Sequence, residues 1–441
     1  MIMFTDLQVI AVAVLILASV SCVAEAAVEP PENPGMAVVV QPGTYTVRGH
    51  KVTIDKVYRL PIDRPEEVEV KSECQVLSDE KPVSFGGGTA LNKTCGPIDA
   101  GIRLPYAIVS ESVRVHSSED GGAVYEEGRD YFLDHQWGGL SRVDTGRVTK
   151  DTKVYIDYKV TLERIDVILV SKNGTITLKK GKSAPVLAVA PSPDAGCIAL
   201  ANVYIPYRCS AITTENILPA PEKDITWRDF IKTSGREYLQ NTIRLLNENK
   251  PVSIVCWGDS VTVGCSVVPL SNGYTERFRR ALSAAYPGSE IHLVNAGIGA
   301  THTDTRLGSF DKEVLSYNPN LITVEFVNDC SYPAEKIIAN WNKFIAQARL
   351  KNPKVEIIVI TPSFTMPNIF NDYNGAVDAM RRVAEDNKVA LADTTNIWAN
   401  LSKVGIPYLT LLANGINHPN DLGHDFFTAG LMDLLKPAED R

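Results

Sequence analysis

The second half of the chain contains five short runs of consecutive apolar residues, separated by longer stretches in which apolar residues recur at helical spacing. Such a run is typical of a strand buried on both faces, because a half-exposed strand alternates polar and apolar residues. The runs lie at 253–257, 291–294, 321–327, 355–360 and 389–392. Their alternation with helical stretches predicts an α/β domain over 225–441, with a doubly wound, mostly parallel sheet of five strands.

The stretches around these runs predict helices at 225–249, 274–285, 334–350 and 375–386. In an open parallel sheet, ligands bind beyond the carboxyl ends of the strands. We therefore expect the functional residues in the turns that directly follow the apolar runs.

The region before this domain, 28–220, shows a different pattern. Short runs rich in Val, Ile and Tyr are separated by turn residues such as Lys172-Asn173-Gly174, and Pro219-Ala220-Pro221-Glu222 is typical of a linker. The clearest runs are 36–40, 52–57, 67–70, 153–160 and 165–170. This pattern predicts an all-β region of one or two sandwich-like modules.

The N-terminus has the pattern of an export signal. Residues 9–20 form an apolar run too short for a transmembrane helix, and Ala24-Glu25-Ala26 offers the small residues that signal peptidase requires. We expect a signal peptide at 1–26, a secreted or periplasmic protein and no stable membrane insertion. An uncleaved anchor is the alternative, because no Lys or Arg precedes the apolar run.

Net charge limits the classes of binding partner, and the cysteines suggest candidate disulfide bonds. The net charge of −8 argues against binding to nucleic acid or to anionic membranes, since both require a basic surface. Export permits disulfides, and Cys74 with Cys95 and Cys197 with Cys209 are candidate pairs. No metal or organic cofactor is implied.

The first apolar run ends in the tight turn Trp257-Gly258-Asp259-Ser260. A serine in a strand-to-helix turn is exposed, and its own N–H points to where an oxyanion would form. By itself the tripeptide Gly-Asp-Ser is equally compatible with an ordinary helix cap. Three further motifs follow later runs: Asn295-Ala296-Gly297, Asn328-Asp329, and a C-terminal loop with Asn417-His418-Pro419-Asn420.

These four motifs, in this order, resemble those of the SGNH/GDSL hydrolases over residues 250–436, and the resemblance implies a flavodoxin-like α/β/α fold. It also implies that Ser260 is the nucleophile and His418 the general base. The oxyanion hole would combine the N–H of Ser260, an N–H of Gly299 or Ala300, and the side chain of Asn328. Ala300 stands where the family has glycine, so it would be strained if the loop required a positive φ.

Asn414 marks the main departure from the family, since relatives with this motif have Asp four residues before the histidine. An amide oxygen can accept a hydrogen bond from the imidazole, but it lacks the charge that stabilises the imidazolium; in serine proteases the corresponding Asp→Asn change costs about 10⁴ in kcat. We considered three alternatives: a backbone carbonyl orients His418 in a Ser–His dyad, which we favour; Asp393 or Asp421 reaches the ring; or the protein is a weak or inactive enzyme.

The combination of an exported β region with such a domain is similar to that of carbohydrate esterases. We therefore expect a serine esterase that hydrolyses short acyl esters, acetyl above all, on carbohydrate through an acyl-Ser260 intermediate. The alternatives are a cell-wall glycan O-acyltransferase, which would use the same residues, and a catalytically weak glycan-binding protein with a degenerate triad. Trp137, in a glycine-rich loop expected to be exposed, is a candidate for sugar binding.

Overall fold

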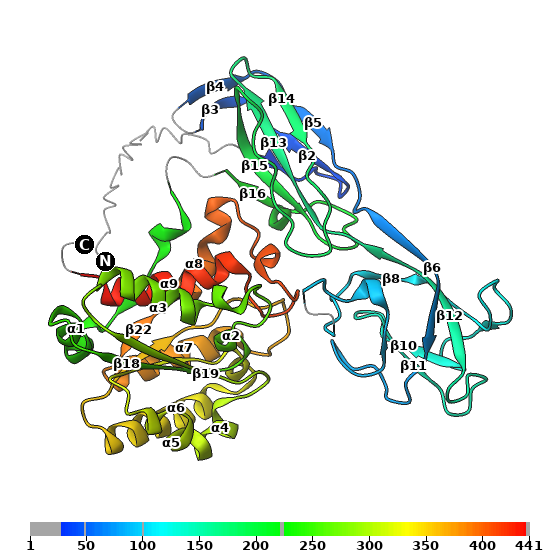
Figure 1. The fold of residues 1–441 in the computed structure, drawn as a ribbon. Coiled ribbons are helices and arrows are strands. Elements are labelled where there is room, and N and C mark those ends of the chain that lie inside the picture. The colour runs from blue at the N-terminus through cyan, green and yellow to red at the C-terminus, as the bar shows by residue number, and fades with distance from the viewer. Residues whose placement is uncertain (1–27, 48–49, 99–100, 221–224, 438–441) are drawn as a thin grey trace, which may run out of the picture.

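The computed structural model describes residues 28–47, 50–98, 101–220 and 225–437. The expected signal peptide at 1–26 and the second half of the expected linker, Pro221-Glu222, lie outside the described residues. Figure 1 shows two β-rich bodies, at the top and on the right, and an α/β body at the lower left.

The β-rich bodies are two clusters of antiparallel sheets. The first β cluster contains the sheets β1-β2-β5, β3-β4 and β14-β13-β15-β16, whose apolar faces share one core. Its strands are β1 (Val28–Glu29), β2 (Ala37–Val40), β3 (Gly43–Val47), β4 (His50–Ile54), β5 (Tyr58–Pro61), β13 (Arg164–Ser171), β14 (Ile176–Lys179), β15 (Cys197–Ile205) and β16 (Ile217–Pro219).

The second β cluster is inserted into the first, between β5 and β13. It contains the sheets β6-β12-β8-β9 and β10-β11-β7 around a core of its own. Its strands are β6 (Glu67–Val76), β7 (Thr89–Ala90), β8 (Ile108–His116), β9 (Val124–Tyr125), β10 (Tyr131–Leu133), β11 (Gly139–Arg142) and β12 (Lys153–Thr161). The paired strands β6 and β12 join the two clusters (Figure 1). The predicted all-β character of this region is confirmed.

The α/β body has one six-stranded sheet in the order β17-β22-β21-β20-β18-β19, parallel except for β17. Each of the five predicted runs forms a strand of this sheet, so the predicted fold class is confirmed. The strands are β17 (Thr233–Ser234), β18 (Val252–Gly258), β19 (Ile291–Gly297), β20 (Leu321–Glu325), β21 (Glu356–Ile360) and β22 (Ala390–Ala392). The sixth strand, β17, is a two-residue antiparallel edge that the sequence did not predict.

The segment that contains β17 also corrects the prediction of one helix over 225–249. It holds two 3-10 turns, η3 (Trp227–Phe230) and η4 (Arg236–Leu239), around β17, and only α1 (Gln240–Asn247) is an α-helix. Gly235 has a φ of 76°, outside the helical region, and this ends any continuous helix before η4.

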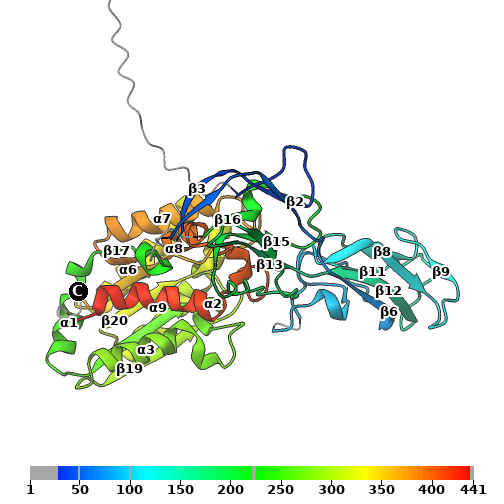
Figure 2. The ribbon, with the colours of Figure 1, turned by 90° about the horizontal axis from the view of Figure 1, so that it is seen from above.

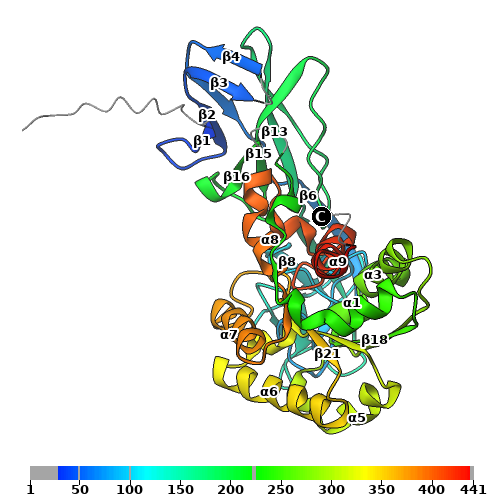
Figure 3. The same ribbon diagram turned by 90° about the vertical axis from the view of Figure 1, so that its left-hand side faces the viewer.

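Helices cover both faces of the sheet (Figure 3). Val255 and Trp257 of β18 pack beneath α6 and α7, whereas Ile254 and Cys256 face α1, α3 and α9. Because side chains alternate along a strand, this two-sided burial explains why the runs are apolar throughout. The helices are α2 (Ser260–Val263), α3 (Tyr274–Ala285), α4 (Thr303–Arg306), α5 (Phe310–Glu313), α6 (Ala334–Lys351), α7 (Tyr373–Asp386), α8 (Thr395–Asn400) and α9 (Asp421–Leu435). Among the described residues, none of these helices is long and apolar enough to cross a membrane.

The candidate disulfides are absent from the described part of the chain. The backbone of Cys74 pairs in register with Tyr155 of β12, whereas the backbone of Cys95 forms an isolated β-bridge with Arg103. The two thiols therefore belong to different parts of the second β cluster. Cys197 and Cys209 also remain thiols. The short sequence separation that suggested both pairs does not bring the sulfur atoms together.

The β region packs against the side of the α/β body that carries α2 and α8 (Figure 2). The Asn202 side chain of β15 donates a hydrogen bond to the Gly405 carbonyl at 2.6 Å. From the second β cluster, Trp137 packs with Met366 and Ile416. The contact therefore reaches the loop that contains His418.

Candidate active site

Ser260 lies at a sharp turn between β18 and α2. A Cβ on Gly258 would lie 2.0 Å from Thr262 Oγ1 and 2.2 Å from the Glu325 carbonyl oxygen, so only glycine fits there. Asp259 caps the short helix, because its side chain accepts the backbone N–H two residues further on at 3.1 Å. Ser260 is 6% exposed and is the first residue of the helix, with its hydroxyl at the carboxyl end of the strand.

The imidazole of His418 is in contact with this serine: Nε2 lies 2.9 Å from Ser260 Oγ. His418 belongs to a loop between η10 (Tyr408–Leu411) and α9. The loop is closed by a hydrogen bond from the Ala413 N–H to the His418 carbonyl at 2.8 Å. The structure thus brings together the two residues that the motifs predicted to act as nucleophile and base.

The side chain of Asn414 does not accept a hydrogen bond from the His418 imidazole, the role considered for it above. Its amide oxygen accepts the backbone N–H groups of Ile416, Asn417 and His418, each at 2.9 Å. Its nitrogen donates to Asn417 Oδ1 at 3.1 Å. The side chain therefore fixes the backbone of the loop and is directed to the main chain of His418, not to its ring.

The two carboxylates considered as alternatives also have other partners. Asp393 forms an ion pair with Arg381 at 2.9 Å, and Asp421 lies 3.5 Å from the Arg277 guanidinium. The Nδ1 atom of His418 instead lies 2.8 Å from the hydroxyl of Ser266. Sequence reasoning missed Ser266 because no motif includes it, and only the course of the chain after α2 brings it to the ring.

The residues predicted to form the oxyanion hole lie around Ser260. A Cβ on Gly299 would lie 3.8 Å from Ser260 Cβ, so this loop passes directly beside the serine. Within the described residues, the N–H groups of Gly299 and Ala300 donate to no protein acceptor. Ala300 has a φ of 57°, which costs a residue with a side chain about 1–2 kcal/mol. Asn328 donates one amide hydrogen to the Thr301 carbonyl at 3.1 Å, and this leaves the second available.

Three buried carboxyl groups lie beneath the site and connect its turns. Asp259 accepts the Asn328 N–H at 2.9 Å, and Asp329 accepts the Thr303 N–H at 2.9 Å. Burial raises the pKa of Asp259 to about 7 and also raises the pKa of Asp329. Burial, followed by the charge of Asp259, raises the pKa of Glu325. The hydrogen bonds of Asp259 and Asp329 thus connect the segments that follow β18, β19 and β20.

His424, the second histidine of the C-terminal motif, is completely buried. Its Nδ1 accepts the Tyr274 N–H at 3.1 Å, and burial lowers the pKa of the ring to about 3. The imidazole is therefore neutral and holds the start of α3 against α9.

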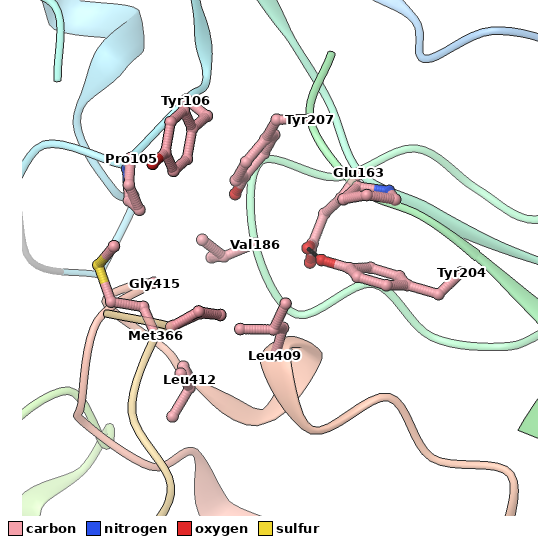
Figure 4. A pocket seen from close by; sticks show the side chains of 12 residues that line it. Pro105, Tyr106, Glu163, Val186, Tyr204, Tyr207, Met366, Leu409, Leu412 and Gly415 are labelled. Atoms are coloured by element: carbon pink, nitrogen blue, oxygen red, sulfur yellow. Dashed lines mark hydrogen bonds between the residues drawn. The ribbon is translucent and has the colours of Figure 1, made fainter. Parts of the chain in front are cut away.

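A cavity of about 140 Å³ lies where the β region meets the His418 loop (Figure 4). Leu412 and Gly415 of that loop form one wall, and the tyrosine rings of Tyr106 and Tyr207 come from the β region. Glu163 is buried at the edge of the cavity, where it accepts hydrogen bonds from the Ala188 N–H at 3.0 Å and the Tyr204 hydroxyl at 2.7 Å.

Trp137 does not have the exposed position that we expected. It is 4% exposed and forms part of the contact with Met366 and Ile416, because its glycine-rich loop folds against the α/β body. Tyr106, at the same boundary, is 51% exposed.

Residues 256–426 match the GDSL-like lipase/acylhydrolase family, which confirms the resemblance drawn from the four motifs. Residues 139–226 match a family described as a domain of unknown function (DUF4815). No curated protein sequence matches the chain at a significant level.

Several solved structures are similar at low identity. A two-domain esterase active on acetylated mannans has 19% identity and a TM-score of 0.42, over 48% of this chain and 56% of that chain. The chain thus spans little more than half of that esterase. A variant of an acetyl-xylooligosaccharide esterase from Geobacillus Stearmophilus has 20% identity and a TM-score of 0.37, over 42% of this chain and 94% of that chain. The lipase/acylhydrolase from Enterococcus faecalis has 19% identity and a TM-score of 0.35, over 41% and 94%.

Proposed function

We propose that residues 256–426, a GDSL-like lipase/acylhydrolase domain, act as a secreted serine esterase that removes short acyl groups, acetyl above all, from carbohydrate. The observation that carries this proposal is the 2.9 Å contact between Ser260 Oγ and His418 Nε2, at the carboxyl edge of the sheet. A hydroxyl within hydrogen-bond reach of an imidazole is the arrangement that activates a serine nucleophile.

The chemistry follows from these positions. His418 takes the Ser260 proton on Nε2 as Oγ attacks the ester carbonyl, and the protonated ring then gives that proton to the leaving alcohol. The N–H groups of Ser260 and of Gly299 or Ala300, with the second amide hydrogen of Asn328, stabilise the oxyanion. Removal of one such donor typically costs about 3 kcal/mol of transition-state stabilisation. Water, deprotonated by His418, then releases the acyl group from Ser260.

The carbohydrate part of the proposal is supported by the position of the β region. The Tyr106 ring is half exposed at a cavity whose other wall belongs to the His418 loop. The apolar C–H face of a sugar ring packs well on a tyrosine, which offers a broad apolar surface and a polar hydroxyl. A glycan held there would lie next to the loop that carries the base.

Hydrolysis of p-nitrophenyl acetate and of acetylated mannan and xylan tests this function, with wild type beside Ser260→Ala and Tyr106→Ala. We expect Ser260→Ala to abolish both activities. Tyr106→Ala should lower the activity on polysaccharide and leave the small ester almost unaffected, since only the glycan would reach the cavity.

The outcomes separate the proposal from its alternatives. If the wild type hydrolyses none of the three substrates, the esterase assignment is wrong. Transfer of acetyl to an added glycan in place of hydrolysis would assign the acyltransferase function. Equal loss on both substrates in Tyr106→Ala would contradict a glycan subsite at the cavity.

A further inference from the structure

We propose that the cavity between the β region and the His418 loop binds a quaternary ammonium group, in which a positively charged nitrogen carries only alkyl substituents. Such binding is separate from ester hydrolysis, because it requires no reaction at Ser260 or His418. Two observations carry it: Glu163 is a buried carboxylate that lines the cavity, and the side chains around it are aromatic or apolar.

Glu163 has hydrogen-bond donors but no positive charge beside it. Oε1 accepts the Ala188 N–H at 3.0 Å and Oε2 accepts the Tyr204 hydroxyl at 2.7 Å. Within the described parts of the chain these are its only polar partners, and burial raises the pKa of its carboxyl. A buried carboxylate is costly unless a cation neutralises it. The group that complements Glu163 therefore carries a positive charge and needs no N–H of its own.

The rest of the lining suits a cation that has an apolar surface. Figure 4 shows the Glu163 carboxylate pointing into the cavity, together with the rings of Tyr106 and Tyr207. The remaining side chains of the lining are all apolar, among them Met366 and Leu412. Aromatic rings attract an alkylated ammonium through their electron-rich faces, and apolar side chains pack on its methyl groups.

The size of the cavity agrees with this ligand. Its volume is about 140 Å³, and an apolar protein cavity of about 150 Å³ holds benzene, which is slightly larger than a trimethylammonium group. A sugar ring inside the cavity would leave several hydroxyl groups without partners against the apolar walls. The glycan contact proposed for Tyr106 therefore belongs to the exposed part of that ring, and the ammonium group belongs to the interior.

Isothermal titration calorimetry of the purified chain with choline and with 3,3-dimethyl-1-butanol tests the charge alone, because the neutral alcohol has the same shape with carbon in place of nitrogen. We expect the wild type to bind choline about 10-fold or more tightly than the alcohol, through the carboxylate and the rings. Equal affinities for the two ligands, or no binding of choline, would overturn the inference.

Glu163→Gln removes the charge and can keep the local hydrogen bonds, since its amide oxygen can accept the Ala188 N–H and its amide nitrogen can donate to the Tyr204 hydroxyl. We expect choline to bind about 10-fold more weakly and the alcohol to bind as in wild type. Glu215→Gln is the matched control, because it removes the same charge from an exposed residue of η2 (Thr214–Asn216). Its choline affinity should not change, whereas full choline affinity in Glu163→Gln would contradict the cation site.

Tyr106 provides a second test that does not alter a buried residue, since its side chain is half exposed. Tyr106→Phe keeps the aromatic face, and Tyr106→Leu replaces it with an aliphatic side chain. We expect choline affinity to be retained in the first variant and to fall about 3-fold to 10-fold in the second, with little change for the alcohol. No loss in Tyr106→Leu, or equal losses for both ligands, would count against a cation held by aromatic rings.

Binding and hydrolysis are separate readouts. A chain that binds choline in preference to the alcohol but hydrolyses no ester would overturn the proposed function alone. A chain that hydrolyses esters but does not distinguish the two ligands would overturn the cation site and leave the esterase intact.

Discussion

Asn414 holds the His418 loop through three backbone N–H groups that share its amide oxygen, and the side chain is 2% exposed. In Asn414→Ala these buried donors lose their acceptor, so we expect the free energy of unfolding to fall by about 2 kcal/mol. The kcat should fall as well, since His418 is the last of the three anchored residues. Urea unfolding and ester hydrolysis measure the two effects.

Asn414→Asp is the control for this prediction, because a carboxylate oxygen can accept the same three N–H groups. We expect near wild-type stability and an unchanged kcat. A marked rise in kcat would mean that position 414 acts on the ring, and would contradict the role in the loop described above.

Glu325 has no charged partner among the groups that it contacts: Oε2 accepts a hydrogen bond from Thr262 Oγ1 at 3.3 Å, and Oε1 is buried without a hydrogen bond within the described residues. Burial, followed by the charge of Asp259, raises the pKa of this carboxyl in the folded state above the usual 4.5. The stability that it contributes is therefore present below pH 4.5 and is lost as the pH rises through the folded value.

Glu325→Gln cannot ionise, so its stability relative to wild type should increase with pH. We expect little difference in melting temperature near pH 4.5 and a clear advantage for Glu325→Gln at pH 8 to 9. Melting curves across this range provide the measurement, and an advantage that stays constant with pH would contradict the raised pKa.

Strand order explains why Ser260 and Asn328 lie at one edge of the sheet, because the carboxyl ends of parallel strands meet there. That His418 lies beside Ser260 was predicted only from the resemblance of the four motifs to the SGNH/GDSL hydrolases. The motifs could not predict Ser266. Its contact depends on two residues with left-handed backbone conformations, Gly264 and Ser266. Glycine often adopts this conformation but serine rarely does, so the sequence gives no signal for it at position 266.

At the scale of elements, the strand–turn–helix unit that carries Ser260 has no space for a larger residue at Gly258. In Gly258→Ala the added Cβ would meet Thr262 Oγ1 and the Glu325 carbonyl, both closer than 2.5 Å, so β18 and α2 must separate. We expect a loss of about 100-fold or more in kcat, since even a small displacement of a catalytic group costs that much.

The matched control is Gly308→Ala in η6 (Leu307–Ser309), where an added Cβ meets nothing within 4 Å. Activity and melting temperature of this variant should remain close to wild type. Comparable losses in both variants would contradict the steric explanation for Gly258.

Elements with a continuous apolar or helical pattern were predicted well, and short elements were not. The helix predicted at 274–285 has the bounds observed for α3, because four of its residues face the core at helical spacing. The prediction of one helix over 225–249 was wrong because β17 spans only two residues. Two residues are too few to show the alternation of polar and apolar side chains that identifies a strand.

At the scale of the whole molecule, Trp137 connects the second β cluster to the α/β body through Met366 and Ile416. Trp137→Ala would leave a cavity there, so we expect a loss of about 3 kcal/mol in unfolding free energy. The kcat should also fall, because Ile416 lies two positions before His418. Denaturant unfolding and ester hydrolysis test both effects.

Phe85→Ala is a suitable comparison, since Phe85 forms a T-shaped ring pair with Trp137 but is 40% exposed. Its effect on stability should be well under that of Trp137→Ala. An unchanged kcat in Trp137→Ala despite lower stability would contradict a coupling between the second β cluster and the His418 loop.

The sequence could predict strands in the β region but not their arrangement. The pairing of β6 with β12 joins residues about 85 positions apart, and no local pattern specifies a partner at that separation. The contact of Trp137 with the His418 loop has the same origin, since it depends on where the second β cluster lies in space.

The second β cluster is an insertion whose two ends lie side by side, so it could be removed from the chain at one place. Glu67 and Thr161 pair in register where β6 and β12 leave the first β cluster. Such opposed residues lie about 5 Å apart, a gap that a two-residue turn spans. A chain shortened in this way would retain every strand of the first β cluster and the whole turn that contains Ser260. Excision at this single junction would therefore remove both Tyr106 from the cavity and the Trp137 contact beside the His418 loop, although every strand of the α/β sheet lies outside the excised segment.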